Sequence, residues 1–600
     1  MDRRGIINSL FEKRESGGVG SKRLHLENFS FPSRFPNFFV SKTVSSSFNL
    51  SGAFFLTMEE REESFPLLGR EEILNRLEQR LEGLKKGYRQ NVSLVGPRFI
   101  GKTSLLRRFL TQVRQDAEII PIYILLTVSD FDDFIERWLG GLLQGFLASK
   151  GISFPEEFQL LVKVSREYIP KTLERMREAK KHAFQKKTAL AFRELLSLTQ
   201  VLREETGKKI LLILDEFQCL GALDLADPFG LFGKEMMVQK DTLYLATSSE
   251  PHKTREIFND RLSLLFGNFE VIEVQPLPLA VIRVWIQNQY PNLRIPDADL
   301  RVLSHLLNNR PYYFELFLEG ARIEALKLNP IDWSQDFLMR ILTETLFSDR
   351  GLLNRHFEFE LQGLLCLGRH PRPYVKTLLA VANGRAKLFQ IAAYLGKKAP
   401  EAKKLLQKLV GEGILEKKGS FFCLPDPLFR LWLRYVLQAK ERDLDPTGER
   451  ARSYFQSRLA EEIRKIREED QKDLTGRMES LFREFRNDVV EVSQKRIKCP
   501  AFLEIASRPT NGRFFPILGR TSQGRWFCQV FRDLVTEGDV SGFVEELKRF
   551  RKTIPRRVMV VLGGIDLNAK LLAQEGKIQI WDLENLNALL ELYGKLKIIP

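Results

Sequence analysis

The hydrophobic residues of this 600-residue chain gather in short runs that predict buried strands. Four such runs lie in the first half of the chain, at 92–95, 119–127, 210–214 and 242–250. Leucines at helical spacing precede the first run, at Leu77, Leu81 and Leu84. Because strands that alternate with helices form parallel sheets, the first half is predicted to be an α/β domain with a parallel sheet.

The second half of the chain has other patterns. Residues 280–350 have helical periodicity, and residues 437–490 are charged and helical. Between them, the pattern predicts three helices followed by a hairpin with Gly419 at its turn; the helices lie at about 372–383, 388–395 and 399–411. Residues 491–600 alternate between predicted strands (513–518, 526–531, 557–562, 578–581) and predicted helices (541–552, 567–574, 583–592).

A phosphate-binding loop follows the first strand. The residues from Gly96 to Thr103 have the spacing G-x-x-x-x-G-K-T, and a helix follows them. The glycines let backbone N–H groups face a polyphosphate, and the helix N-terminus adds a positive dipole end. Lys102 is expected to reach the β- and γ-phosphates, and the Thr103 hydroxyl to ligate Mg²⁺. The alternative, a glycine turn with a chance lysine, is disfavoured by the flanking strand and helix.

The predicted binding residues for ATP in this loop are Gly96, Pro97, Arg98, Phe99, Ile100, Gly101, Lys102, Thr103 and Ser104.

An acidic pair ends the third predicted strand. Asp215 and Glu216 follow five apolar residues, at the carboxyl end of the strand, where open α/β sheets bind ligands. This is the pattern of a Walker B strand. Asp215 is expected to hold Mg²⁺ and Glu216 to orient and deprotonate the attacking water. The pair alone is a weak signal, but its place after a phosphate loop makes it a strong one.

Two further segments carry a family resemblance. Leu-Leu-Gly-Arg-Glu at 67–71 precedes the phosphate loop, and Asp-Glu-Phe-Gln occupies 215–218. With the loop, they resemble the archaeal-type ATPase family of the STAND class of P-loop ATPases, which is related to AAA+ proteins. The resemblance implies that Leu68, Gly69 and Arg70 lie near the adenine. Without it, the acidic residues at 71–72 are simply suited to a first helical turn.

The same resemblance implies roles further along. Thr247 and Ser248 end a strand that matches a sensor of the γ-phosphate, although ordinary strand-end hydroxyls remain the alternative. Arg255 or Arg261 would be an arginine finger, and we favour Arg261. The turn at 309–313 stands where the family has a Gly-x-Pro-Tyr turn of a helical lid. Here Asn replaces the glycine, and Asn tolerates left-handed backbone.

The three helices and hairpin at 370–436 predict a winged helix, which the family also carries here. Its third helix offers Lys403, Lys404 and Lys408, and its wing offers Lys417 and Lys418. A winged helix can place its third helix in the DNA major groove or pack on the nucleotide domain, and both interpretations stay open. A second basic run, at 163–187, is either a solvated helix face or a nucleic-acid contact.

Residues 491–600 resemble the restriction-endonuclease-like domain that many archaeal-type ATPases carry. Such nucleases use an Asp and then a Glu-x-Lys on the next strand to bind Mg²⁺ and activate water. Here Gln529-Val530-Phe531 stands in place of Glu-x-Lys, and the preceding strand has no acid. Because an amide cannot supply carboxylate charge to a hard metal, we expect an inactive nuclease fold that serves in binding or docking.

Composition narrows the class of protein. The net charge of +16 favours a polyanion partner, nucleic acid first. No apolar run approaches the length of a membrane helix. Five scattered cysteines without a C-x-x-C pair suit reduced thiols in a cytoplasm. Residues 1–57 are rich in Ser and Phe without period and are expected to be a disordered leader.

The predicted fold class is a multidomain α/β chain with a P-loop NTPase core. The expected parts are a leader (1–57), the ATPase core (58–279), a helical lid (280–369), the winged helix (370–436), a helical connector (437–490) and the nuclease-like domain (491–600). The expected function is a slowly hydrolysing ATP-dependent switch that associates with double-stranded DNA, and with a protein partner or itself. The alternatives are a DNA-binding module with a non-hydrolysing ATP site and an ATP-driven nuclease.

Overall fold

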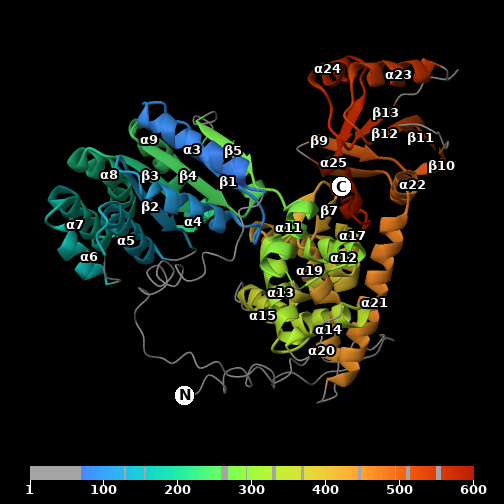
Figure 1. Cartoon of the computed structure of the whole chain (residues 1–600), viewed down its shortest axis with the longest axis horizontal. Helices are drawn as coiled ribbons and strands as arrows, with labels where there is room; N and C mark the ends of the chain where they lie inside the picture. The colour runs from blue at the N-terminus through green and yellow to red at the C-terminus, as the bar shows by residue number, and fades with distance from the viewer. Residues whose placement is uncertain are drawn as a thin grey trace.

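The computed structural model describes most of the chain from residue 69 onward. The described residues are 69–127, 130–153, 157–258, 262, 268–291, 293–326, 333–365, 371–442, 448–492, 495–507, 514–548 and 556–599. The expectations for residues 1–57, Leu68, Arg261 and 263–267 lie outside them. We divide the described chain into an N-terminal domain (69–276), a helical body (277–471) and a C-terminal domain (474–599), which Figure 1 shows from left to right.

The N-terminal domain is built on five parallel strands in the order β2-β3-β4-β1-β5. The strands are β1 (Asn91–Val95), β2 (Ile119–Leu125), β3 (Lys209–Asp215), β4 (Thr242–Ser248) and β5 (Phe269–Glu273). The central strands are apolar on both faces, as in parallel sheets covered by helices on each side. The predicted parallel sheet is confirmed, and β5 is an edge strand that the apolar pattern did not indicate.

Helices cover both faces of this sheet. On one face, α3 (Glu71–Lys85) and α4 (Lys102–Val113) pack against alternate strand residues. The other face is covered by α5 (Phe131–Ser149), α6 (Phe158–Ser165), α7 (Pro170–Phe184), α8 (Thr188–Thr206) and α9 (Pro228–Val238). A 3-10 turn, Phe217–Ala222, follows β3, and a short helix, α10 (Pro251–Glu256), follows β4.

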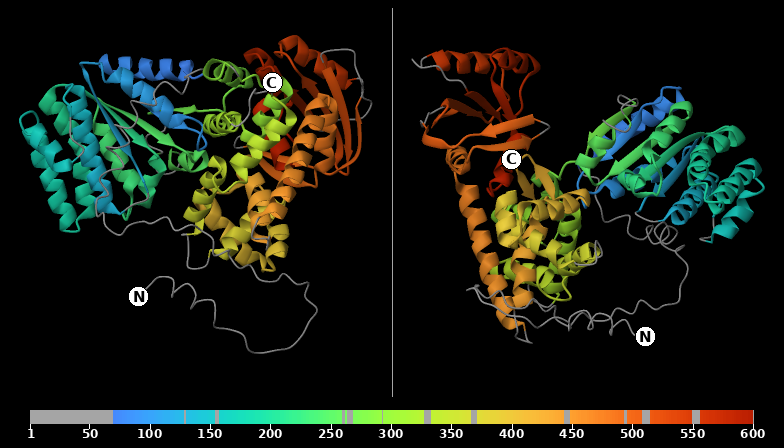
Figure 2. Two further views of the ribbon diagram at one scale, coloured as in Figure 1. Left: turned by 60° about the horizontal axis from the view of Figure 1, so that its bottom comes forward. Right: turned by 180° about the vertical axis from the view of Figure 1, so that it is seen from behind.

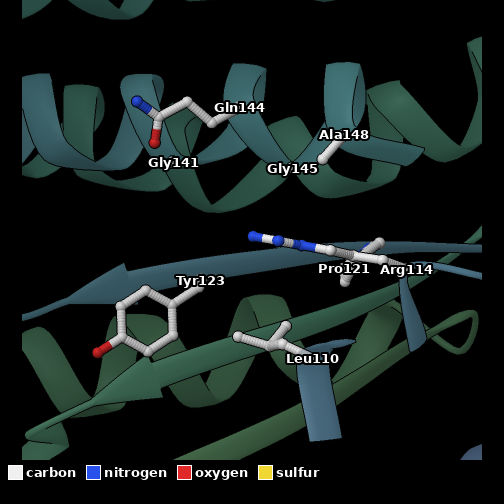
Figure 3. Close-up of a pocket in the computed structure, with 8 residues that line it drawn as sticks. All are labelled: Leu110, Arg114, Pro121, Tyr123, Gly141, Gln144, Gly145 and Ala148. Atoms are coloured by element: carbon white, nitrogen blue, oxygen red, sulfur yellow. The ribbon is translucent and has the colours of Figure 1, made fainter. Parts of the chain in front are cut away.

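Helix α5 lies unusually close to strand β2. A Cβ atom on Gly145 would lie 2.4 Å from the carbonyl oxygen of Pro121, and one on Gly141 would lie 2.7 Å from that of Tyr123. Only glycine fits this approach. Figure 3 shows the pocket at this edge of the sheet, with Gln144 of α5 on one side of β2 and the Tyr123 ring on the other side, toward Leu110 of α4. The close packing holds β2, and with it the Tyr123 side chain, in place.

The helical body has a single hydrophobic core that runs from Leu277 to Ile466. Its first five helices are α11 (Leu279–Gln289), α12 (Asp297–Leu307), α13 (Pro311–Ala325), α14 (Gln335–Leu346) and α15 (Leu352–Leu365). The remaining elements are α16 (Arg372–Ala382), α17 (Leu388–Leu395), α18 (Ala399–Gly411), β6 (Glu416–Lys418), β7 (Phe421–Cys423), α19 (Pro427–Trp432), a π-helical turn (Leu433–Leu437), α20 (Gln438–Arg442) and α21 (Glu449–Gln471). The three helices α16–α18 and the β6–β7 hairpin follow the element order that the sequence predicts; the name winged helix stays a prediction.

The C-terminal domain has a mixed sheet in the order β10-β11-β12-β13-β14. Strands β10 (Phe502–Ser507), β11 (Phe514–Thr521) and β12 (Gly524–Phe531) are antiparallel, and β13 (Arg556–Val561) and β14 (Gln579–Asp582) continue parallel to β12. Helices α22 (Leu474–Glu484) and α25 (Leu583–Leu592) cover one face, and α23 (Glu537–Lys548) and α24 (Leu567–Glu575) the other. A hairpin of β8 (Asp488–Val492) and β9 (Lys495–Cys499) precedes the sheet, and neither these two strands nor β10 was predicted.

The turn of the β6–β7 hairpin is docked on the C-terminal domain. The Ser420 amide donates to the carbonyl oxygen of Val489 in β8 at 3.0 Å, and Phe421 belongs to the core of the C-terminal domain. Of the two lysines that the sequence assigns to the wing, Lys418 is the less accessible. That side chain is half-buried and pairs with Glu416 at 3.1 Å. Lys417 is exposed.

Within the described segments, no helix combines the length and the apolar content needed to cross a bilayer. Cys219, Cys423, Cys499 and Cys528 are free thiols.

Candidate functional site

The phosphate loop has the conformation that its glycines predict. Gly96 closes β1, where its amide donates to the carbonyl oxygen of Ser248 at 3.1 Å. A Cβ atom at this position would lie 2.7 Å from the carbonyl oxygen of Val274, so a larger residue would clash. Gly101 has φ 93° and directly precedes α4. The loop therefore ends on the N-terminus of a helix, whose free N–H groups favour an anion.

Phe99 gives this loop an unusual contact. Its φ of 66° lies in the left-handed region, which is costly for a residue with a Cβ atom. The ring stacks on Tyr312 with centroids 5.1 Å apart, lies 5.8 Å from Tyr313, and meets the ring of His356 edge-on at 4.7 Å. These three partners belong to α13 and α15 of the helical body. We call the four residues the aromatic cluster.

Lys102 is buried beneath the loop. Its Nζ donates to the carbonyl oxygens of Gly96 and Pro97 at 2.8 and 2.9 Å. Burial lowers the pKa of this ammonium to about 8, although the charges of Glu216 and Asp215 oppose the shift. The same charges show that Lys102 lies on the side of the acidic pair, as the sequence predicts.

Asp215 joins the loop to three strands. Its Oδ2 accepts hydrogen bonds from the Tyr123 hydroxyl at 2.7 Å and from the Thr103 hydroxyl at 3.4 Å. Its Oδ1 accepts from the Thr247 hydroxyl and from the Glu216 amide, the latter at 3.2 Å. A hydroxyl and a carboxylate that are this close form a donor set of hard oxygens, which suits Mg²⁺. Burial and the Asp215 charge raise the pKa of Tyr123 well above its usual value, so its hydroxyl stays a donor.

Glu216 is held by residues that the sequence did not indicate. Its backbone is left-handed (φ 57°, ψ 48°), which turns the carboxylate toward the end of β4. There Oε2 accepts from the Ser249 hydroxyl at 2.6 Å, from the Ser249 amide at 3.2 Å, and from the Gln218 side-chain amide. The contact with Gln218 follows from its place in Asp-Glu-Phe-Gln, whereas nothing in the local sequence pairs Glu216 with Ser249.

The residues before the loop lie beside it. Gly69 has φ 80° and faces Val281 of the helical body. The Arg70 guanidinium donates to the carbonyl oxygens of Gln275 at 2.6 Å and Ile100 at 3.3 Å, and burial lowers its pKa to about 10. Arg70 thus ties the loop to the segment that follows β5.

The remaining predicted site residues differ in their exposure and in their contacts. Ile100 is buried, Ser104 is half-buried and Arg98 is exposed. Thr247 is already engaged by Asp215. The Arg255 guanidinium lies 3.5 Å from the Glu273 carboxylate and is partly exposed.

A buried ion pair continues from the aromatic cluster into the region after β7. Arg310 donates to Asp426, which also accepts from the Tyr313 hydroxyl. Burial alone would lower the pKa of Arg310, but the Asp426 carboxylate more than offsets that effect. Beside this pair, burial raises the pKa of Glu360 to about 7 and lowers that of His356 to about 4.

The C-terminal domain lacks the acids that a nuclease needs at the predicted place. Gln529 of β12 is buried opposite Pro516 of β11, and its Oε1 has no hydrogen-bond partner. Glu504 of β10 pairs with Arg520 at 3.0 Å on the surface. Among the described residues, no three His, Cys, Asp or Glu side chains lie close enough to hold a metal ion. The absence of nuclease activity stays a prediction.

A comparison of the sequence with models of protein families supports the interpretation of residues 96–103 as a phosphate-binding loop. A family model described as an AAA ATPase domain matches residues 66–229. This part of the chain is a P-loop ATPase domain. The matched segment contains the phosphate loop, Asp215 and Glu216, and it ends within α9. The match ends before β4 and does not include the helical body or the C-terminal domain.

Several solved structures are similar over a longer stretch. A Walker-type ATPase of Pyrococcus abyssi is 22% identical, with a TM-score of 0.42 over 61% of this chain and 95% of that one. ORC2 of Aeropyrum pernix is 13% identical, with a TM-score of 0.37 over 62% and 94%. ORC1 of the same organism, solved in complex with DNA, is 14% identical, with a TM-score of 0.37 over 66% and 95%. None of the curated proteins matches the chain.

Proposed function

We propose that the protein is an ATP-binding and slowly hydrolysing switch. The observation that carries this proposal is the convergence of Lys102, Thr103, Asp215 and Glu216 at one edge of the parallel sheet. Lys102 would hold the β- and γ-phosphates once they replace the carbonyl oxygens that it now contacts. Thr103 and Asp215 would hold Mg²⁺, which neutralises charge on the phosphates when it is bound.

Glu216 is the proposed base for the attacking water. In the structure its carboxylate is bound to Ser249 and Gln218. Its Oε2 already accepts three hydrogen bonds and so has no position left for a water molecule. Hydrolysis therefore needs this carboxylate to leave Ser249, which supports slow turnover and a protein that spends most of its time holding nucleotide.

The aromatic cluster supports the proposal that nucleotide binding changes the conformation of the helical body. Phe99 belongs to the phosphate loop, and its partners Tyr312 and His356 belong to α13 and α15. Any change of the loop on binding therefore moves a ring that is packed between two helices. Arg310 and Asp426 extend this path from α13 to α19.

The test is the Glu216→Gln variant. We expect it to bind ATP with unchanged affinity and to lose most of its hydrolysis, because the amide cannot take the proton. Glu204→Gln on α8, an exposed carboxylate, is the matched control and should hydrolyse at the parental rate. If neither Glu216→Gln nor the parent hydrolyses the ATP that it binds, the protein is a binding module whose nucleotide only stabilises its shape; equal hydrolysis by both would remove Glu216 as the base.

We further propose that duplex DNA associates with the exposed face of α18. Lys403, Lys404 and Lys408 lie on that face, and the exposed Phe389 and Tyr394 lie on the neighbouring α17. Since β8 covers the turn of the hairpin, this contact would be made by helices and not by Lys418. Neutralising the three lysines of α18 should weaken duplex binding and flatten its salt dependence. ATP hydrolysis with and without duplex DNA tests whether the two activities are coupled.

A further inference from the structure

The α7–α8 hairpin of the N-terminal domain ends in an ordered tip. Residues 185–187 join the two helices, and all three of their amides are hydrogen-bonded, to Lys181, Ala183 and His182 at 2.8–3.1 Å. His182 is itself bound to Glu194 of α8 at 2.7 Å. Buried side chains of both helices hold the hairpin together, among them Met176 and Phe192. The tip is therefore a fixed platform and not a loose loop.

An aromatic side chain projects from this platform. Phe184 is 92% exposed, more than any other large hydrophobic side chain among the described residues. It is the last residue of α7 and does not belong to the core that holds the hairpin together. Leaving a phenyl ring in water forgoes the free energy that its burial would give. An ordered segment that does so is a candidate for contact with a flat apolar partner.

The same tip is strongly basic. Lys181, Lys186 and Lys187 lie within three residues of Phe184 along the chain and are exposed, and none is ion-paired within the described chain. The nearby acids have partners of their own: Glu178 pairs with Arg175, and Glu194 contacts His182. Because α7 ends and α8 begins at this tip, their helix dipoles oppose each other there and the lysines set its charge.

We infer that this tip binds nucleic acid with unpaired bases, through stacking on Phe184 and phosphate contacts to Lys181, Lys186 and Lys187. The combination of an exposed ring and cations within reach of it matches a polyanion that also carries aromatic faces. Base–aromatic stacking and a basic track are the two parts of single-strand recognition. A duplex hides its base faces, so its binding at the tip would use only the lysines.

The site is separate from the α18 surface. In Figures 1 and 2, α6, α7 and α8 lie at the end of the molecule farthest from the C-terminal domain. The inference does not rest on ATP hydrolysis or on DNA binding by α18. A variant of the tip should leave the hydrolysis rate without DNA unchanged, and this also shows that the domain is folded.

The experiment measures binding of a labelled oligothymidine by fluorescence anisotropy over a range of salt, with the full chain. Phe184→Ala should weaken binding about 5- to 150-fold without changing the salt slope, as expected for one lost stack. Phe184→Tyr should restore it. Replacing Lys181, Lys186 and Lys187 by Ala should reduce the slope of log K against log salt by about 2, since each single-strand phosphate contact contributes ~0.7.

The matched control replaces three other exposed lysines of the same domain, Lys86, Lys234 and Lys240, by Ala. Equal binding by the tip variants, this control and the parent would overturn the inference. A loss in the lysine variant with none in Phe184→Ala would overturn the stacking contact. Stronger Phe184-dependent binding to phosphatidylserine vesicles or polyglutamate than to oligothymidine would replace nucleic acid with a membrane or an acidic protein.

Discussion

Substitutions of Phe99, the strained residue of the phosphate loop, can separate two effects. One is the affinity for ATP, and the other is the coupling between the loop and the helical body. Phe99 has φ 66°, a conformation that costs a residue with a Cβ atom about 1–2 kcal/mol. Each aromatic pair contributes ~0.5–1.5 kcal/mol beyond burial. With three ring partners, the aromatic cluster offsets the backbone cost and keeps the loop in the curled form that presents its N–H groups.

Two substitutions separate the effect of the backbone strain at Phe99 from the effect of its ring contacts. Phe99→Ala keeps the strain but loses the rings, so the curled loop becomes less populated, and ATP affinity should fall about 5- to 30-fold. Phe99→Gly adopts the left-handed conformation at no steric cost, so its affinity should stay within about threefold of the parent. Both variants remove the contact with Tyr312 and His356, and both should uncouple the loop from the helical body.

Titration with a fluorescent ATP analogue measures the affinity. Hydrogen exchange across α13 (Pro311–Ala325), with and without nucleotide, measures the coupling. Tyr312→Ala leaves the loop sequence intact and removes its stacking partner, so it should weaken binding in the same direction as Phe99→Ala. The reasoning fails if Phe99→Gly loses as much affinity as Phe99→Ala, because relief of strain would then have no effect. It also fails if nucleotide changes exchange in α13 equally in all variants.

Three further predictions concern buried charges. Because the pKa of Lys102 is lowered to about 8, raising the pH from about 7 to about 9 should weaken ATP binding about tenfold, with proton uptake on binding by calorimetry. Glu360 has a pKa raised from 4.5 to about 7, so folding stability should fall as the pH rises from 4.5 through 7. In Glu360→Gln, the melting temperature should change less with pH over this range. Asp426→Ala leaves Arg310 buried without its partner and should cost about 3–5 kcal/mol, measured by denaturation. The double variant Arg310→Met/Asp426→Leu should recover part of that loss.

Sequence patterns predicted which residues lie together at the candidate site better than they predicted the surrounding contacts. The spacing from Gly96 to Thr103 and the position of Asp215 after an apolar strand depend on local backbone requirements, which sequence displays directly. Their spatial proximity follows from parallel strands ending at one edge of a sheet. The match of residues 66–229 to an AAA ATPase domain confirms that this segment is a P-loop ATPase domain, and it does not address the roles of single residues.

Contacts between distant segments were not predictable in the same way. Tyr123 reaches Asp215 only because β2 pairs with β3, and its apolar run shows no sign of that hydrogen bond. Ser249 holds Glu216 because the left-handed backbone of Glu216 redirects its carboxylate. The sequence left open whether the hairpin at 416–423 contacts DNA or packs on the protein, and β8, which covers its turn, was not predicted.

The pattern of contacts between the three parts indicates where a nucleotide can act. The helical body and the C-terminal domain are joined by a buried aromatic residue (Phe421), an ion pair (Lys387 with Asp488 at 2.6 Å) and a hydrogen bond from the Lys597 ammonium to the Asn308 side chain at 3.1 Å. Among the described hydrophobic side chains of the N-terminal domain, Phe99 is the one packed against the core of the helical body. A ligand shifts a conformational equilibrium only through contacts that differ between the two states. Since the triphosphate would contact the loop that carries Phe99, the interface that it can alter is the one between the N-terminal domain and the other two parts, which would then move together.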